Sequence, residues 1–413
     1  MIADHTALPA VTDAQECPVN NQRKVTPQTD HPHKAIEVDA EGIWHIHGYD
    51  ETRQILRSDL VKQAGFNSEV VIDKTQNILK NQPILFLDGE EHHRMRRETN
   101  KFFTPSITDK QYRDFMHNFA DEQVETLKRK RRANLNELTM DMALSVAGRV
   151  VGLTSSIVPG LSSRLNGVLD MAKTDLKESP NPIRLLFAQR YMLAFLWLDV
   201  KPAIRARRKN PQNDVISYLI SRDYSDLEIL TECVVYGVAG MVTTREFICV
   251  ALWHLLDNPH LRQRMLVGSQ EERYAILHEI LRLEPVIGHL YRRTTAALAI
   301  ESEGHSVTIP AGTLIDLNIY TTNIDPHMAG ENAAAVCPVR PLNSALGKVP
   351  EYVMSFGDGA HRCPGAYLAI QESDILLVKL LQLETLRIEK KPDVAFNPSV
   401  NSYELFNFPV TLD

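Results

Sequence analysis

The chain has no surplus of basic residues, few cysteines, no internal repeats and no low-complexity segment. Its 413 residues carry a net charge of −7, which excludes a protein dedicated to nucleic acid binding. The cysteines show no paired spacing, and their odd number fits a reducing cytoplasm better than a secreted domain built on disulfides. They are Cys17, Cys233, Cys249, Cys337 and Cys363.

No stretch of apolar residues is typical of a membrane span. The richest stretch, residues 185–200, is interrupted by Gln189, Arg190 and Asp199, whereas a span needs about 20 consecutive apolar residues. No signal peptide is recognisable at the start of the chain. We therefore expect a cytoplasmic protein without a membrane span.

What the chain does contain is enough apolar content, 44%, to bury a large core. Periodicity predicts helices over most of its length, including a long one at 226–257, and short strands near residues 44–48, 296–301, 306–317, 385–390 and 407–412. We expect a mainly α-helical fold with a small β-sheet region. Residues 1–38 are predicted to be a polar, partly flexible tail, and residues 39–413 a single domain.

One ten-residue segment, Phe356 to Gly365, places a single cysteine among glycines just before a predicted helix. The unpaired N–H groups at a helix N-terminus stabilise a thiolate and lower the pKa of a cysteine. A zinc site is a poor alternative, because Cys363 and His361 have no C-x-x-C partner pair in the chain. A lone cysteine can also be a small buried apolar residue, so other segments have to decide.

This segment resembles the cysteine-ligand loop of the cytochrome P450 haem-thiolate monooxygenases. That loop reads Phe, two residues, Gly, one residue, His or Arg, one residue, Cys, one residue, Gly, and every fixed position is filled here. The resemblance implies the helix-rich triangular prism of that family and a bound haem b. It also implies that Cys363 is the axial ligand of the iron, with Phe356, Gly357, His361 and Gly365 beside the haem.

A second segment supports the resemblance. Glu279 and Arg282 are three residues apart in a predicted helix and so share one face. An exposed pair of this kind contributes little, but the E-x-x-R helix of the family turns both side chains inward to brace the cysteine loop. Arg340 is in the place expected of the third member of that network.

A third segment, residues 88–97, resembles the family helix that crosses the edge of the haem. His92 and Arg96 are four residues apart and lie on one helix face. The resemblance implies that they donate hydrogen bonds to the haem propionates, together with His361 and Arg293, which we prefer to Arg292. The alternative is a solvated basic helix face.

The fourth segment lies in the middle of the long helix, where glycines call for an explanation. The resemblance implies that Ala239 and Gly240 open a groove for dioxygen and that Thr243 places its hydroxyl there. Close helix packing is the alternative. The residue before this threonine is usually acidic in the family and passes protons onward, but here it is Val242. Glu246, one turn further along, is expected to substitute in part.

Position in the family fold predicts which residues face the substrate. Those we expect there are Phe86, Ile287, His289, Tyr403 and Leu405. Several are apolar, which favours a largely hydrophobic substrate.

The resemblance implies a monooxygenase that takes electrons from a ferredoxin with its reductase, or from a flavodoxin, and inserts one oxygen atom from dioxygen into a small organic molecule. Two alternatives stay open. One is a haem-thiolate enzyme that uses peroxide or carries out an atypical oxidation such as oxidative coupling. The other is a non-catalytic haem-binding sensor.

Overall fold

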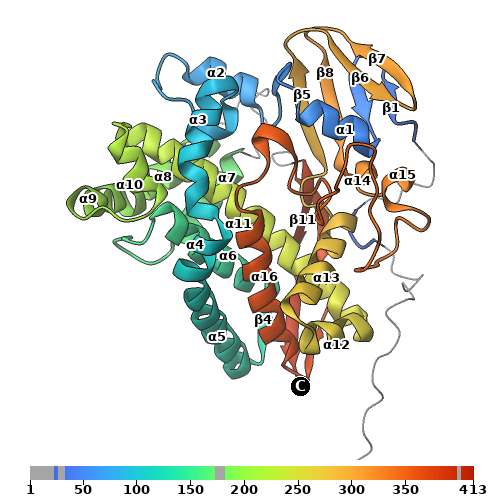
Figure 1. Ribbon diagram of the computed structural model, residues 1–413. Coiled ribbons are helices and arrows are strands. Elements are labelled where there is room, and N and C mark those ends of the chain that lie inside the picture. Colours follow the sequence, from blue (N-terminus) through green and yellow to red (C-terminus); the bar gives the residue numbers. More distant parts are fainter. Residues whose placement is uncertain (1–22, 27–32, 173–181, 398–400) are drawn as a thin grey trace, which may run out of the picture.

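The computed structural model describes residues 23–26, 33–172, 182–397 and 401–413, and in this part of the chain helices dominate. Figure 1 shows helices over the left and lower parts of the molecule, with α11 (Asp226–Asp257) and α16 (Ala366–Leu381) running through its middle, and a β-rich region at the upper right, where short helices lie beside the strands. A large apolar core lies among the helices, and a smaller one lies between the main sheet and the short helices beside it.

Helices account for most of the described elements. They are α1 (Tyr49–Leu56), α2 (Ser68–Thr75), α3 (Gly89–Thr99), α4 (Pro105–Ile107), α5 (Arg113–Lys130), α6 (Leu135–Val151), α7 (Leu161–Ala172), α8 (Pro182–Phe195), α9 (Lys201–Lys209), α10 (Val215–Ser221), α11 (Asp226–Asp257), α12 (Pro259–Val267), α13 (Gln270–Leu283), α14 (Ile319–Thr322), α15 (Pro326–Ala329) and α16 (Ala366–Leu381). Short 3-10 or π segments are η1 (Ile84–Phe86), η2 (Asn100–Phe103), η3 (Thr108–Tyr112), η4 (Leu196–Val200) and η5 (Gly359–His361).

The strands form small sheets. They are β1 (Ile36–Val38), β2 (Trp44–Ile46), β3 (Val61–Gln63), β4 (Arg132–Asn134), β5 (His289–Thr294), β6 (Leu298–Ser302), β7 (His305–Ile309), β8 (Leu314–Asn318), β9 (Leu386–Ile388), β10 (Asp393–Asn397), β11 (Ser402–Phe406) and β12 (Pro409–Leu412). The main sheet has the order β1-β2-β8-β5-β3, and only its β2–β8 pair is parallel. The strand expected at 306–317 is two strands, because a turn at Pro310–Thr313 separates β7 from β8.

α11 is the central helix of the protein. It begins with a capping box in which Ser225 and Glu228 satisfy each other's backbone N–H groups, and it ends before Pro259. By length and composition α11 could cross a membrane, because an 18-residue stretch of it has a mean hydropathy of 1.4. However, 56% of this stretch is buried inside the protein. The expectation that no apolar stretch reaches membrane-spanning length is therefore wrong for α11, whose apolar surface forms core.

Part of the predicted N-terminal tail belongs to the fold. Arg23 and Thr26 are buried, and the backbone N–H of Thr26 donates to the buried carboxylate of Glu284 at 2.8 Å. Further along, β1 pairs with β2 at the edge of the main sheet. The boundary predicted at residue 38 is therefore too late; residues 1–22 and 27–32 lie outside the described part of the chain.

The cysteines differ from the expected set of unpaired thiols. Cys233, Cys249 and Cys363 are free, whereas Cys337 is disulfide-bonded. Cys17 lies outside the described residues.

A buried ionic network joins α13 to the segment that follows α15. The guanidinium of Arg282 is fully buried and donates to both oxygens of Glu279, at 2.7 Å each. Arg340 adds a bond to Glu279 at 3.3 Å. Arg282 also donates to the carbonyl oxygens of Asn323 and Ala333. The expected inward-facing triad is therefore present in the fold.

We expect Arg282→Ala to lower the free energy of unfolding by about 3–5 kcal/mol, because it leaves Glu279 buried without its cationic partner. Urea denaturation measures the loss. The control is Arg264→Ala, which removes a partly exposed ion pair with Glu272 and should cost about 0–1 kcal/mol. Equal losses in the two variants would show that burial of the Arg282 pair has no special weight.

Candidate active site

The segment before α16 is a tight loop held by backbone geometry. Gly357 and Gly359 have φ of +67° and +66°, a region that glycine enters without strain. A Cβ at Gly359 would lie 1.9 Å from the carbonyl oxygen of Leu56, so no other residue fits there. Asp358 caps the next turn through the N–H of Gly359 and forms an ion pair with Arg57 of α1. The loop is therefore anchored to the sheet side of the molecule.

Cys363 lies where this loop enters α16. Its N–H donates to the carbonyl oxygen of Phe356 at 2.9 Å, which closes the loop on itself. Burial raises the pKa of the Cys363 thiol, while the N–H of Gly365 and the charges of Arg96 and Arg362 lower it. The pKa is raised overall, contrary to the sequence-based expectation. Burial outweighs the N–H of Gly365 and the two arginine charges.

A cavity of about 760 Å³ opens over this cysteine. Its wall includes Cys363 itself, Ala239 and Thr243 of α11, and Phe86 and Ile287, as expected from the sequence. Most of the other lining side chains are apolar. They include Phe66, Val71, Ile84, Leu85, Val234, Val235, Val238, Val242, Phe247, Val286 and Leu290.

Cationic and imidazole side chains gather at another part of the same cavity. His92, Arg96, Arg292 and His361 all line it. The rings of His92 and His361 stack with centroids 4.1 Å apart, and His361 also contacts Asp88 at 3.0 Å. Among the described residues, Asp88 is the only carboxylate that contacts any of these four side chains.

The groups in this cluster are buried without the anions that cations normally require. Burial lowers the pKa of His92 to about 3 and that of Arg292 to about 10. The Nδ1 of His92 and the Nε of Arg96 are buried and have no hydrogen-bond partner in the described part of the chain. A buried cation is stable only when it is paired. The cluster is therefore arranged to receive anionic groups.

The arginine in this cluster is Arg292 and not the predicted Arg293. Successive residues of a strand point to opposite faces. In β5 the side chain of Arg292 points to the cavity, where it donates to Gln63 at 2.6 Å. Arg293 points the other way, where its Nε and Nη2 donate to the two carboxylate oxygens of Glu69 at 2.7 and 2.9 Å and its Nη1 donates to the carbonyl oxygen of Gly312 at 3.0 Å. The sequence-based choice between the two was wrong by one residue.

The comparison with known proteins identifies the family. The sequence model described as Cytochrome P450 matches residues 31–271 and 274–405. This chain belongs to the cytochrome P450 family. The biotin biosynthesis cytochrome P450 of Bacillus subtilis is 25% identical over 82% of this chain and 82% of its own length. The erythromycin C-12 hydroxylase of Saccharopolyspora erythraea is 23% identical over 83% of this chain and 82% of its own length.

Solved structures support the same fold. P450BioI, in complex with an acyl carrier protein that carries hexadec-9Z-enoic acid, matches with a TM-score of 0.71 and 23% identity, over 90% of this chain and 93% of that one. CalO2 matches with a TM-score of 0.74 and 18% identity, over 92% and 93%. The cyclomarin C epoxidase CymV of Salinispora arenicola is 28% identical over 58% of each chain. The chain is a P450 monooxygenase of the bacterial type.

Enzymes of this family carry a haem whose iron is bound by a cysteine thiolate, and the site fits such a group. The Nδ1 of His92 and the Nε of Arg96 have no hydrogen-bond partner among the described residues, and the carboxylates of a haem are suitable acceptors for them. Cys363 lies in the same cavity wall and is free. A Cβ at Gly365 would have one neighbour within 4 Å, the sulfur of Cys363 at 4.0 Å. The approach to the thiol is therefore open on this side.

The α11 residues of this P450 divide into two roles. Thr243 faces the cavity, and its hydroxyl donates to the carbonyl oxygen of Ala239 at 2.6 Å. Gly240 does not line the cavity: a Cβ there would lie 3.3 Å from that of Ala147 on α6. Gly240 therefore permits close packing of α11 on α6, which was the alternative reading of that glycine.

Glu246 is not on the cavity wall, so its expected role as a substitute for the missing acid is corrected. One oxygen accepts from Nε of Arg245 at 2.7 Å, and the other accepts the N–H of Leu405 at 2.8 Å. Burial raises its pKa to about 7, against the opposing charge of Arg245. The first oxygen is thus paired within α11 and the second holds β11 against α11, so neither is left to face Thr243.

Three residues predicted to contact substrate are placed elsewhere. His289 donates from its Nδ1 to a carboxylate oxygen of Asp316 at 2.8 Å within the main sheet. Tyr403 is buried, and its hydroxyl donates to the carbonyl oxygen of Glu284. Leu405 is also buried in the helical core. None of the three lines the cavity among the described residues.

The polar part of the substrate wall was not predicted. Arg245, Asn397 and Glu404 line the cavity, and Arg245 forms an ion pair with Glu404 at 3.2 Å. In β11 the alternation of side chains sends Glu404 to the cavity and its two neighbours to the core. Only the pairing of β10 with β11 beside α11 could have revealed this corner.

Two carboxylates of α11 hold the loop that carries the apolar wall. Glu232 accepts the N–H of Ile84 at 2.9 Å, and Glu228, one turn earlier, accepts the N–H of Asn81. Burial raises the pKa of Glu232 to about 8. Burial also acts on Glu228, but its hydrogen bonds outweigh it and lower its pKa.

Glu232 predicts a measurable pH dependence. Its carboxyl keeps a proton in the folded protein up to about pH 8, whereas the unfolded chain loses it near about pH 4.3. Its contribution to stability is therefore full at low pH and is lost as the pH rises between these values. Glu232→Gln removes this loss, so its melting temperature should rise relative to the wild type from about pH 5.5 to about pH 8.5.

Glu228→Gln is the matched control on the same helix. The lowered pKa of Glu228 leaves it ionised in both states across this range, so the difference from the wild type should stay constant. A constant difference for Glu232→Gln as well would contradict the assignment of a protonated Glu232.

Proposed function

We propose that this P450 inserts one oxygen atom from dioxygen into a small, largely apolar organic molecule. The observation that carries the proposal is that Thr243 and Cys363 line one cavity whose other walls are mostly apolar. Arg245 and Glu404 add a charged corner. A substrate with one polar end would be oriented by this corner, because a partly buried ion pair offers it hydrogen-bond partners.

The cofactor is proposed to be haem b. The chain has no C-x-x-C-H sequence of the kind that attaches haem covalently. Haem b, once bound, would supply the iron at which dioxygen is activated. Cys363 would hold it as a thiolate, helped by the N–H of Gly365, and His92, Arg96, Arg292 and His361 would neutralise its carboxylates.

Thr243 is proposed to deliver a proton into the cavity. Its hydroxyl can both donate and accept, and it now donates to Ala239 at 2.6 Å. Breaking that bond by rotation would turn the donor toward the cavity. The neighbouring Val242 also lines the cavity, but its side chain has no acidic proton. The protons that reach Thr243 therefore have to come through water or from the substrate.

The electron donor is proposed to be a ferredoxin with its reductase, or a flavodoxin, in the cytoplasm. Arg94, Arg97 and Lys101 are exposed on α3 and η2, beside the cysteine loop, which also carries exposed Arg362. Arg96 joins the two elements by donating to the carbonyl oxygen of Arg362. A local cationic surface of this kind attracts an acidic partner although the whole chain is acidic.

The test of the proposed site is the spectrum of the purified protein. The wild type should carry one haem b, and its ferrous carbon monoxide adduct should show the red-shifted band typical of thiolate ligation. Cys363→Ser should lose that band, whereas the buried thiol of Cys249 serves as the control, so Cys249→Ser should retain it. The opposite result, a band kept in Cys363→Ser and lost in Cys249→Ser, would show that Cys363 is not the ligand.

A second candidate function is an oxidation that uses peroxide as the oxidant, and Val242 favours it. Val242 cannot pass protons to the cavity, and with a poor proton supply the electrons taken from NAD(P)H are lost as peroxide instead of forming product.

We expect Val242→Glu to raise the product formed per NAD(P)H consumed and to lower peroxide release with a shared substrate and redox partner. Val242→Gln is the control, since it has the same size but carries no acidic proton. If the wild type is tightly coupled and both variants are worse, proton supply does not depend on position 242.

A further inference from the structure

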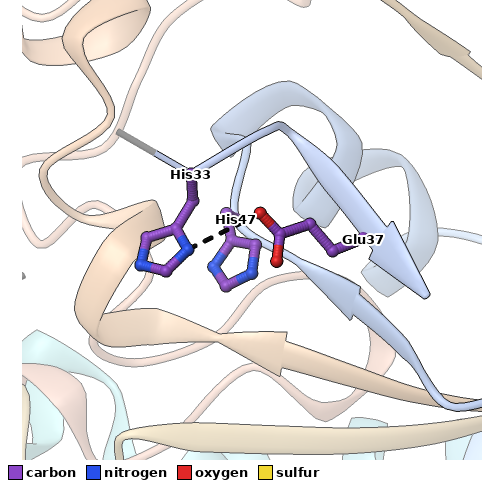
Figure 2. A group of neighbouring side chains, drawn as sticks. All are labelled: His33, Glu37 and His47. Carbon is purple, nitrogen blue, oxygen red and sulfur yellow. Dashed lines mark ion pairs between the residues drawn. The ribbon is translucent and has the colours of Figure 1, made fainter. Parts of the chain in front are cut away.

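A cluster of two histidines and a glutamate lies at the edge of the main sheet, apart from the cavity. His33, Glu37 and His47 each offer one ligand atom, and these atoms all lie within 4.8 Å of one another. Figure 2 shows His47 between the ring of His33 and the carboxylate of Glu37. None of the three is among the residues that line the cavity.

Strand pairing explains why these residues meet. The N–H of His47 donates to the carbonyl oxygen of Ala35 at 2.9 Å, and β1 continues with Glu37 opposite His45. Continued by one residue, this register puts Ala35 opposite His47, and Glu37 is two residues further along on the same face. His33 precedes β1, and its ring stacks on that of His47.

His47 is already prepared as a ligand. Its Nδ1 is 2.8 Å from the hydroxyl of Thr321, which fixes the ring, and its Nε2 forms no hydrogen bond with the described residues. The side chain is buried, and burial lowers its pKa to about 4, so the imidazole is neutral near pH 7. A metal-bound histidine commonly has its second nitrogen held in this way.

The neighbouring histidine does not compete for the same role. Both nitrogens of His45 already have carboxylate partners, Asp316 at 2.9 Å and Asp39 at 3.1 Å. His33 and Glu37, by contrast, are partly exposed, and their only mutual contact is a long one of 3.7 Å. They can therefore move toward an ion without breaking a strong interaction.

We propose that His33, Glu37 and His47 form a binding site for a divalent transition metal ion, for which Zn²⁺ fits best, with water in the fourth position. Two imidazole nitrogens and one carboxylate oxygen are a ligand set that zinc accepts in tetrahedral sites. Mg²⁺ and Ca²⁺ prefer oxygen ligands and fit less well.

Binding requires one local movement. The rings of His33 and His47 are stacked, with centroids 4.2 Å apart and planes at 12°, and two stacked rings cannot both point a nitrogen at one ion. Zinc–nitrogen bonds of about 2.0–2.1 Å bring ligand atoms to about 3.3 Å from one another. His33 therefore has to turn out of the stack, which its partial exposure permits. The ion would then tie the segment before β1 to the end of β2.

The test uses tag-free, haem-loaded, full-length protein treated with a chelator and then titrated with Zn²⁺. Equilibrium dialysis with metal analysis should find one tight zinc ion per chain, and zinc should raise the melting temperature. His33→Ala and Glu37→Gln should each weaken binding at least about tenfold, and Thr321→Val about tenfold through His47. His305→Ala, an exposed histidine on β7, is the control and should bind as the wild type does.

The proposal is overturned if no stoichiometric zinc binds, or if the affinity is the same in His33→Ala, Glu37→Gln and the wild type. His33 and Glu37 lie on the surface, so their replacement should not prevent folding. Haem content and the carbon monoxide spectrum, recorded for every variant, should not change. Those readouts keep a failure at this site distinct from a failure of the proposed monooxygenase function.

Discussion

The position of Cys363 depends on one buried cation, the guanidinium of Arg282. It has no contact with solvent, so every N–H it presents needs an acceptor inside the protein. Glu279 supplies the charge, and carbonyl oxygens of Asn323, Ala333 and Ala335 supply the rest. These acceptors come from separate stretches of chain that have no regular secondary structure to align them. Satisfying Arg282 therefore brings them together.

The same stretches lead directly to Cys363. Asn323 accepts the N–H of Met354 and donates to the hydroxyl of Ser355, which in turn bonds to α13. Phe356 follows, and its carbonyl oxygen holds the N–H of Cys363. On the far side of the loop, Asp358 is tied to α1 and so to the smaller apolar core. The two cores thus meet at the loop, so the segment that carries Cys363 is held from both sides.

Patterns with fixed local spacing could be predicted from the sequence. The cysteine loop, the Glu279–Arg282 pair and the capped start of α11 each depend on residues a few positions apart, and the fold contains all three. The hydrogen bonds of the Lys24 and Thr26 backbone to Glu284 could not be predicted, because they join residues about 260 apart that share no pattern. The composition of residues 1–38 is polar, and polarity alone does not distinguish a tail from a segment whose polar groups are satisfied.

The errors at the cavity have a common physical origin. Arg293 was preferred to Arg292, and Tyr403 and Leu405 were expected at the cavity, where Glu404 lies between them in sequence. In both strands the correct strand was chosen but the wrong face. A shift of one residue reverses every side chain of a strand, and these strands have no clear alternation of apolar and polar residues to set it. The consequence for function is large. With Glu404 and Arg245 in the wall, the cavity is not a uniform apolar container but a site that can orient a substrate by one polar group.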